Sequence, residues 1–199
     1  MRGNHFPMTR EGRYGILFLS ETARKLRKMG EQMAKKAYYG LTKYLLLFMA
    51  AAFIGWLYEI ICVYITLGYY SDRGVLHLPM CPIYGFGMLI LYILFHRFHN
   101  AAVLFLGSAL VTTAVELAVS YILEWHWHTE LWSYREWPLN YQGRICVISS
   151  VAFGLLALFF FKVMKPCADR LFSGKAGKIV SVLTLLLLAF CVVWEMRLR

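Results

Sequence analysis

Two glutamates lie deep inside apolar stretches of this 199-residue chain. Glu59 belongs to the run 44–68 and Glu116 to the run 101–125. An ionisable side chain at the centre of a membrane helix costs about 2.5–3.5 kcal/mol on insertion scales, so its presence calls for a partner, a wet cavity or a function. Counted at 1.5 Å per residue, both glutamates lie about 22 Å from the same membrane side. We therefore expect the two carboxyl groups at one depth, in the outer half of the membrane.

Polar residues recur at helical spacing around each glutamate, which gives each helix one polar stripe. Two such stripes facing lipid are unfavourable, so we expect them to face each other or a third element. Arg73 and Arg144 are the cations expected at that level. The stripes consist of Gly55, Glu59, Cys62 and Thr66 in the first run and of Thr112, Glu116, Ser120 and Glu124 in the third.

These residues together predict a polar, charge-paired pocket. Arginines there would hold an anionic or zwitterionic group by bidentate contacts, while Glu59 or Glu116 would carry a proton. Arg144 is expected to turn inward and bridge Glu116 to a second acceptor, which lysine could not do. The alternative is that the charges form buried pairs that only fix helix packing. The predicted ligand-binding residues are Glu59, Arg73, Tyr84, Glu116, Glu124, Asn140 and Arg144.

Other chemistry is poorly supported by the sequence. It contains no GxxxxGK[ST], GxSxG, HExxH or paired CxxC motif, so ATPase, hydrolase and zinc classes are disfavoured. The segment 124–130 alternates Glu and His with bulky residues, which could bind a metal, but its tryptophans favour an interfacial aromatic belt. We predict no metal and no cofactor. Cys81 and Cys146 are the two cysteines expected near the oxidising face, so a disulfide between them is possible.

Composition places these candidates in a membrane protein. Apolar residues make up 60% of the chain and charged residues 16%, against about 45–50% and about 25% in soluble domains. The sequence predicts an all-α integral membrane protein with a bundle of about five transmembrane helices in residues 44–199. The expected spans are 44–68, 83–98, 101–125, 145–164 and 178–196.

Charge distribution predicts the orientation of the bundle. With the N-terminus inside, sixteen Lys and Arg residues fall on the cytoplasmic side and five on the other, which favours an N-in/C-out topology. Residues 1–43 form a basic segment, and within it 15–41 predicts an amphipathic helix lying on the anionic inner leaflet. The alternative is that the apolar face of this helix packs on a soluble protein instead of on the membrane. Nucleic-acid binding is not expected, because no groove-reading motif accompanies the charge.

The segment 78–87 interrupts the second span. Two prolines and two glycines predict irregular backbone at its outer end and leave a helix of about 24 Å, too short for a hydrocarbon core of about 30 Å. Such backbone is tolerated at membrane depth only where protein or water covers it. We therefore expect this segment to line a protected cavity.

Several ordered motifs resemble a known family. They are Gly55–Glu59, Arg73-Gly74, Pro79–Gly87, Glu116 with Ser120 and Glu124, Trp132-Ser133-Tyr134 and Leu139–Ile145. Over about 44–160 the chain resembles the family named Putative ABC-transporter type IV, CmpB-like small bacterial membrane proteins. The resemblance implies a multi-pass protein of the bacterial inner or plasma membrane, working with a separate ATPase subunit. It implies no catalytic residues, and Ser133 stands where the family usually has an acidic residue.

The first hypothesis is a membrane transport component, an ABC-type permease or a substrate-binding membrane subunit, for a small-molecule or lipid substrate. The alternatives are an intramembrane enzyme acting on a lipid or lipid-linked group, with the two carboxyl groups as acid and base, and a non-catalytic scaffold. A cavity open sideways to lipid, or turnover by the purified chain, would favour the enzyme.

Overall fold

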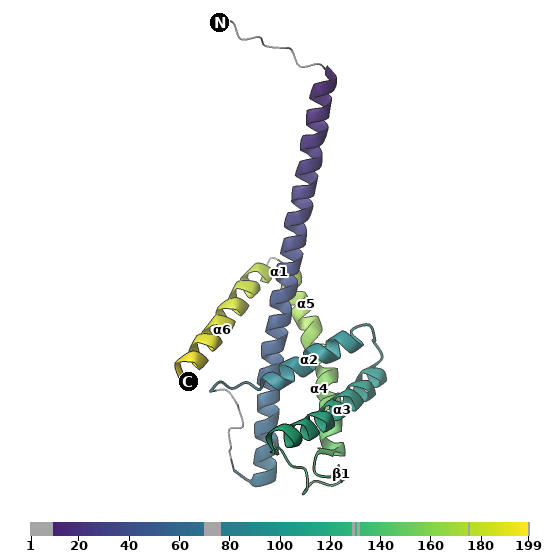
Figure 1. Ribbon diagram of the computed structural model, residues 1–199, viewed down its shortest axis with the longest axis vertical. Coiled ribbons are helices and arrows are strands. Elements are labelled where there is room, and N and C mark those ends of the chain that lie inside the picture. Colours follow the sequence, from purple (N-terminus) through teal and green to yellow (C-terminus); the bar gives the residue numbers. More distant parts are fainter. Residues whose placement is uncertain (1–9, 70–76, 129, 131, 175, 199) are drawn as a thin grey trace. The chain divides into compact units, whose positions relative to one another are not determined.

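The computed structural model is helical apart from one small hairpin (Figure 1). It describes residues 10–69, 77–128, 130, 132–174 and 176–198; side chains are described from residue 21 onward, except at 66, 67 and 127. The chain divides into two compact units, residues 1–41 and 42–199. Arg73, one of the predicted ligand-binding residues, lies outside the described part.

The first helix is longer than the sequence predicted. Helix α1 (Arg10–Leu67) is unbroken over 58 residues. The basic segment and the first apolar run had been expected as separate elements on either side of residue 43. Neither Gly30 nor Gly40 ends the helix, because the residues around them are good helix formers.

The remaining elements belong to unit 2. Within the described residues of the whole chain, four helical stretches are long and apolar enough to cross a membrane, beginning with Glu21–Ile65 of α1, which starts in unit 1. The others are α3 (Ala101–Trp127), the stretch Val147–Ser173, and α6 (Ala176–Leu198). Helix α2 (Pro82–Phe95) has 14 residues, about 21 Å at 1.5 Å each, and is too short to cross alone. The described part of the chain is thus helical, with four stretches that are long and apolar enough to span a membrane.

The fourth apolar run continues past its predicted end at residue 164. It consists of α4 (Val147–Phe159), the π-helical turn η1 (Phe160–Met164) and α5 (Lys165–Ser173). Pro166 lies in the first turn of α5, where proline is tolerated. The π turn pairs the backbone before Pro166, with the Lys165 amide donating to the Phe160 carbonyl. The predicted end of the span at residue 164 was therefore too early.

Only part of the segment 78–87 is irregular. The backbone is non-helical over Leu78–Cys81, and the Cys81 amide donates to the Ala52 carbonyl of α1 at 3.0 Å. Pro82 then starts α2, which contains both glycines that had been expected in the irregular stretch. The absence of a Cβ at Gly85 makes room for the Phe48 ring, which would lie 2.6 Å from that atom. This segment therefore packs directly on α1 near Phe48 and Ala52.

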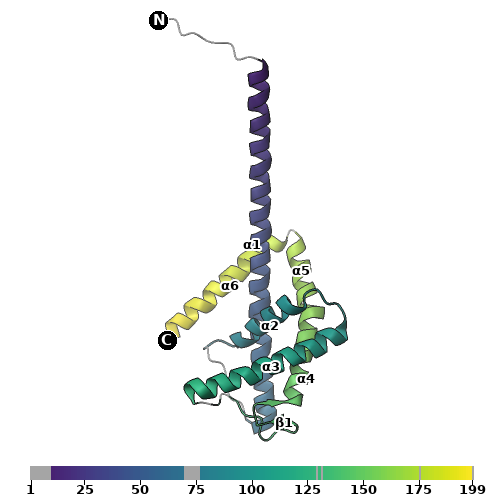
Figure 2. The same cartoon turned by 45° about the vertical axis from the view of Figure 1, so that its right-hand side comes forward.

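Small and hydroxyl side chains join the helices of unit 2. Helix α3 crosses α4 (Figure 2), with the Phe105 ring against Gly154 and Thr113 hydrogen-bonded to Ser150 at 2.6 Å. Thr42 of α1 bonds Ser181 of α6 at 2.9 Å, and both are buried. The apolar core between α1, α2, η1 and α5 contains Leu47, Met88, Phe160 and Ala168. Side chains facing away from these contacts are largely apolar and exposed, as lipid contact requires.

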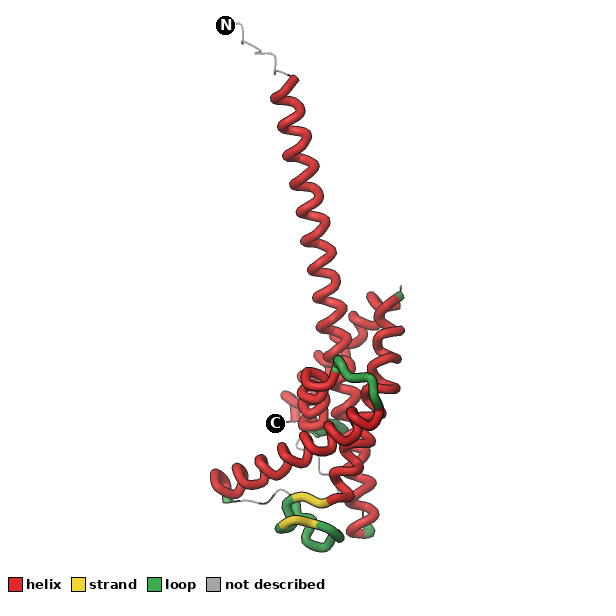
Figure 3. Tube along the Cα trace, turned by 90° about the vertical axis from the view of Figure 1, so that its right-hand side faces the viewer, coloured by secondary structure: helices red, strands yellow, loops and turns green. Residues whose placement is uncertain are grey.

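A hairpin precedes α4 (Figure 3). Strands β1 (Asn140–Tyr141) and β2 (Ile145–Cys146) pair antiparallel. The turn between them has positive φ at Gln142 and Gly143, as a type I′ turn requires, and the Arg144 amide donates to the Tyr141 carbonyl at 3.0 Å. We refer to residues 132–146 as the cap. The sequence does not predict these two strands, each of which is only two residues long.

Candidate functional site: a carboxyl cluster beneath a hairpin cap

Glu116 of α3 is held by the cap. Tyr134 donates its hydroxyl hydrogen to Glu116 Oε1 at 2.7 Å, while Glu116 Oε2 is buried and has no hydrogen-bond partner in the described residues. Ser149 lies near this carboxyl group, but its hydroxyl donates to the Cys146 carbonyl at 2.9 Å. Burial, followed by the nearby Glu116 carboxylate, raises the pKa of the Tyr134 phenol above its ordinary value. Tyr134 therefore stays protonated at neutral pH and remains a donor to Glu116.

The cap holds Tyr134 through its own backbone. The Tyr134 amide donates to the Gly143 carbonyl at 2.8 Å, and the Trp132 indole donates to the Arg144 carbonyl at 2.9 Å. Asn140 fixes the turn, because its side-chain oxygen accepts from the Gly143 amide at 3.0 Å. Asn140 was predicted to bind ligand, but in the structure it shapes the hairpin that carries Tyr134.

Glu59 lies in the same neighbourhood. The Cys81 thiol donates to Glu59 Oε2 at 3.6 Å, and the largely buried Tyr84 lies within electrostatic reach of Glu59, Tyr58 and Tyr134. Tyr58 in turn lies within reach of Glu116. We call Glu59, Cys81, Tyr84, Glu116 and Tyr134 the carboxyl cluster. Tyr58 and Tyr84 lie between its two carboxyl groups, Tyr84 within reach of Glu59 and Tyr58 within reach of Glu116.

A disulfide between Cys81 and Cys146 is not formed in the structure, because both are free thiols.

Aromatic packing fixes the cluster. The rings of Tyr58, Tyr84 and Phe153 pack against one another, with their centroids 6.2–6.3 Å apart. Tyr84 can approach α1 only because residue 55 is glycine: a Cβ there would lie 2.1 Å from Tyr84 Cγ. Gly55, which the sequence placed on the polar stripe of α1, thus provides the space for a tyrosine of α2.

Arg144 does not bridge Glu116. Its guanidinium pairs with Glu124, two turns further along α3, and stacks over the Tyr121 ring at 4.1 Å from the centroid. The hydrogen bond to Glu124 raises the pKa of Arg144, so the cation persists at any physiological pH. The side chain is 16% exposed, so it turns inward as expected, but the predicted Glu116 partner was wrong.

A small cavity lies beside this arginine. It has a volume of about 10 Å³, close to the lower limit for one water molecule. Arg144 Nε is buried and has no hydrogen-bond partner in the described part of the chain. The cavity is lined by Ser120, Leu123, Glu130, Trp132, Gln142, Gly143 and Arg144. Ser120 lies one helical turn from Glu116 on α3, so the cavity reaches the turn of α3 that follows Glu116.

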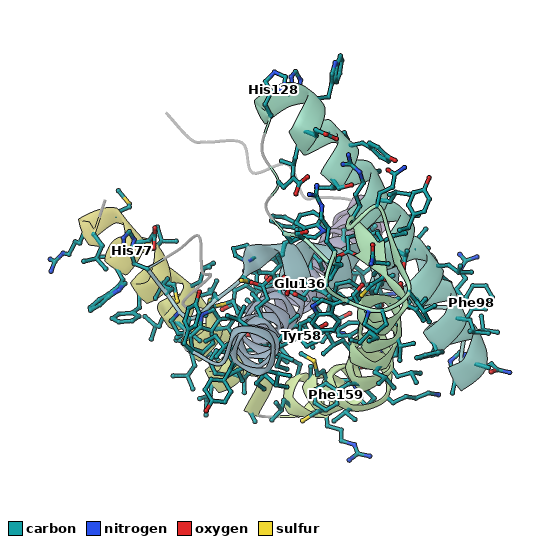
Figure 4. All side chains as sticks on the ribbon, turned by 90° about the horizontal axis from the view of Figure 1, so that it is seen from below. Tyr58, His77, Phe98, His128, Glu136 and Phe159 are labelled. Atoms are coloured by element: carbon teal, nitrogen blue, oxygen red, sulfur yellow. The ribbon has the colours of Figure 1, made fainter. Side chains whose placement is uncertain are left out.

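Other predicted features have structural partners. In the segment 124–130, Glu130 pairs with Arg135 at 2.9 Å, and His128 ends α3 in a left-handed conformation. His77 lies beside α6 (Figure 4), where its amide donates to Glu195 at 3.0 Å. Thr112 and Ser120 donate their hydroxyls to carbonyls of their own helix. The polar stripe of α3 therefore contributes mainly its two glutamates.

The role of Tyr134 does not follow from the sequence. An aromatic residue beside Trp132 is typical of a membrane interface, whereas the structure uses the Tyr134 hydroxyl to bind Glu116. The available signal was its position between Trp132 and the turn at Gly143, within a motif shared with a family.

Comparison with protein families supports a shared architecture. The family model described as Putative ABC-transporter type IV matches residues 46–196. The chain belongs to this family. The match includes α6, which the motif comparison had left outside, and excludes the basic residues before 46. No curated protein and no solved structure matches the chain.

The chemistry of Arg144 gives a first prediction. Arg144→Lys should lower the thermal unfolding midpoint by a few degrees although the charge is kept. One ammonium cannot both pair with Glu124 and stack its plane on Tyr121. Thermal unfolding in detergent, followed by tryptophan fluorescence, measures the change. The matched control is Arg135→Lys, whose partner Glu130 is exposed; equal midpoints for the two variants would contradict the assigned role of Arg144.

Proposed function

We propose that this protein is a membrane transport component that binds a small zwitterionic molecule at the carboxyl cluster. In this proposal the chain is an N-in/C-out bundle of five helices, with α2 completed by the irregular segment 78–81. The cluster then lies in the outer half of a bacterial cell membrane. The family description supports the transport assignment, and the lack of a Walker A motif means that a separate ATPase subunit would supply any energy from ATP.

The observation that carries the proposal is the state of Glu116. Its Oε2 is buried without a hydrogen-bond partner in the described residues, while Oε1 is held by Tyr134. Leaving a buried carboxylate oxygen unpaired is unfavourable, so taking up a proton or an ammonium group at that oxygen is favourable. A carboxyl group that gains a partner from substrate or solvent is a common means of coupling in transporters.

Arg144 supplies the opposite charge. Its Nε is buried and has no hydrogen-bond partner in the described residues, beside the water-sized cavity that Ser120 of α3 also lines. In this proposal a carboxylate or phosphate group accepts from Nε. An acceptor at Glu116 and a donor at Arg144 together favour a zwitterion over a purely anionic substrate.

A binding screen tests this proposal. Thermal unfolding of the purified protein would be measured with a panel of zwitterionic, anionic and cationic small molecules. A ligand at 100 times its Kd should stabilise the folded state by about 2.7 kcal/mol. We expect a zwitterionic compound to stabilise the wild type and Glu136→Gln, an exposed control on the cap, but not Glu116→Gln. Counterflow of that compound in proteoliposomes would then test transport.

Two results would contradict the proposal. Equal stabilisation of the wild type and Glu116→Gln would place the ligand elsewhere. Chemical turnover of a lipid by the purified chain would favour the intramembrane enzyme instead. The enzyme hypothesis and the scaffold hypothesis both stay as predictions from the sequence.

A further inference from the structure

The part of α1 before unit 2 presents a surface that the transport proposal does not use. We call residues 21–41 the basic helix. Every residue from Glu21 to Tyr38 is exposed, and the segment contains six Lys and Arg against two Glu. Its one ion pair in the described residues joins Arg27 to Glu31 at 3.0 Å. Most helical stability in proteins comes from packing of one face rather than from propensity, so a partner is expected to cover one face of the basic helix.

Apolar and small residues form one seam along the basic helix. They recur at alternating spacings of three and four, which is the heptad pattern of a coiled coil. The large members, Leu26 and Met33, are 62% and 70% exposed, and nothing lies within 4 Å of the Cβ position of Gly30. The seam consists of Ala23, Gly30 and Ala37 at one heptad position and Leu26, Met33 and Gly40 at the other.

The residues beside the seam permit pairing with an identical helix. Two copies inserted in a membrane with the same topology present this segment in parallel. In a parallel pair, each residue that precedes Ala23, Gly30 or Ala37 faces the residue five positions later on the other helix. The facing pairs are Thr22 with Arg27, Met29 with Ala34, and Lys36 with Leu41. No pair opposes two like charges, and the remaining lysines and arginines point away from the seam.

We propose that the basic helix pairs with the basic helix of a second copy in a parallel two-stranded coiled coil. Small residues at every second seam position let the backbones approach, and Leu26 and Met33 pack against their counterparts. A lipid surface fits this face less well. Helices that lie on membranes insert aromatic and large aliphatic side chains, whereas most of this seam is alanine and glycine.

Disulfide trapping tests the seam directly. The full chain, with the exposed Cys167 replaced by serine, would carry either Met33→Cys in the seam or Lys35→Cys on the opposite face. In vesicles of neutral phosphatidylcholine, mild oxidation should give at least about tenfold more covalent dimer with Met33→Cys, since seam positions of a parallel pair face each other. Adding Leu26→Glu to Met33→Cys should abolish the dimer, whereas adding Lys28→Glu should not.

Salt dependence separates a second copy from an anionic surface. Each basic helix carries a net charge of +4, six basic minus two acidic residues, so raising salt from about 0.05 to 0.5 M should increase trapping by screening repulsion. Equal trapping at residues 33 and 35, or none at 33, would overturn the proposal. Loss of trapping when anionic lipid is added, restored by salt, would also overturn it and identify the lipid headgroups as the occupant.

Discussion

Replacing Gly55 by alanine should destabilise the protein by about 1–3 kcal/mol, the usual cost of forcing extra volume into a packed interior. The new methyl group would lie 2.1 Å from Tyr84 Cγ and 2.6 Å from Tyr84 Cβ, so the clash falls on the base of the ring rather than on a flexible end. Relief requires α2 to move from α1. The thermal unfolding midpoint in detergent measures the effect.

A second glycine provides the matched control. Gly87 lies in α2, and nothing is within 4 Å of its Cβ position, so Gly87→Ala should be neutral or stabilising by about 0.5–1 kcal/mol. Combining Gly55→Ala with Tyr84→Ala should remove most of the cost of the first change, because the clashing ring is gone. Equal midpoints for Gly55→Ala and Gly87→Ala would mean that Tyr84 does not pack on Gly55.

Displacing Tyr84 should also affect binding. Its ring contacts those of Tyr58 and Phe153, and it lies within reach of Glu59. Gly55→Ala should therefore weaken the ligand-induced stabilisation proposed above, in addition to lowering stability. A variant with lower stability and unchanged ligand response would separate packing at Gly55 from the binding site.

The helices could be predicted from the sequence because long apolar runs have one favourable structure in lipid. Backbone groups there must bond within the segment, so runs such as 101–125 become helices whatever their neighbours. Local exceptions were harder to predict. Pro166 lacks an amide hydrogen, which from the sequence indicates the end of a helix. The π-helical turn before Pro166 pairs the backbone carbonyls differently, and its formation depends on the packing of the whole segment.

The candidate site was partly predictable for a similar reason. Burial cost identifies Glu59 and Glu116 from the sequence, but partner choice needs geometry. Glu116 and Glu124 share one face of α3 and lie eight residues apart, about 12 Å along the axis. Periodicity alone cannot say which of them Arg144 reaches. The turn at 142–143 decides it: it directs Arg144 to Glu124 and leaves Tyr134 for Glu116.

That turn gives the last prediction. Gly143 has φ +71°, and a Cβ there would lie 2.5 Å from Arg135 Cγ. Gly143→Ala should therefore cost about 1–3 kcal/mol in backbone strain, with any clash against Arg135 in addition. Gly174→Ala is the control, because Gly174 has φ −109° and nothing lies within 4 Å of its Cβ position. Its unfolding midpoint should match that of the wild type.

The same substitution tests whether the cap controls the carboxyl cluster. The Gly143 carbonyl accepts the Tyr134 amide, so a shifted turn should draw the Tyr134 hydroxyl away from Glu116. Gly143→Ala should then lose ligand-induced stabilisation, as should Tyr134→Phe, which removes the hydroxyl that bonds Glu116. The fluorescence of Trp132, whose indole bonds the Arg144 carbonyl, should change with Gly143→Ala as well. If Gly143→Ala lowers stability but binds ligand like the wild type, the hairpin serves only to stabilise the bundle, and Glu116 must be positioned by α3 alone.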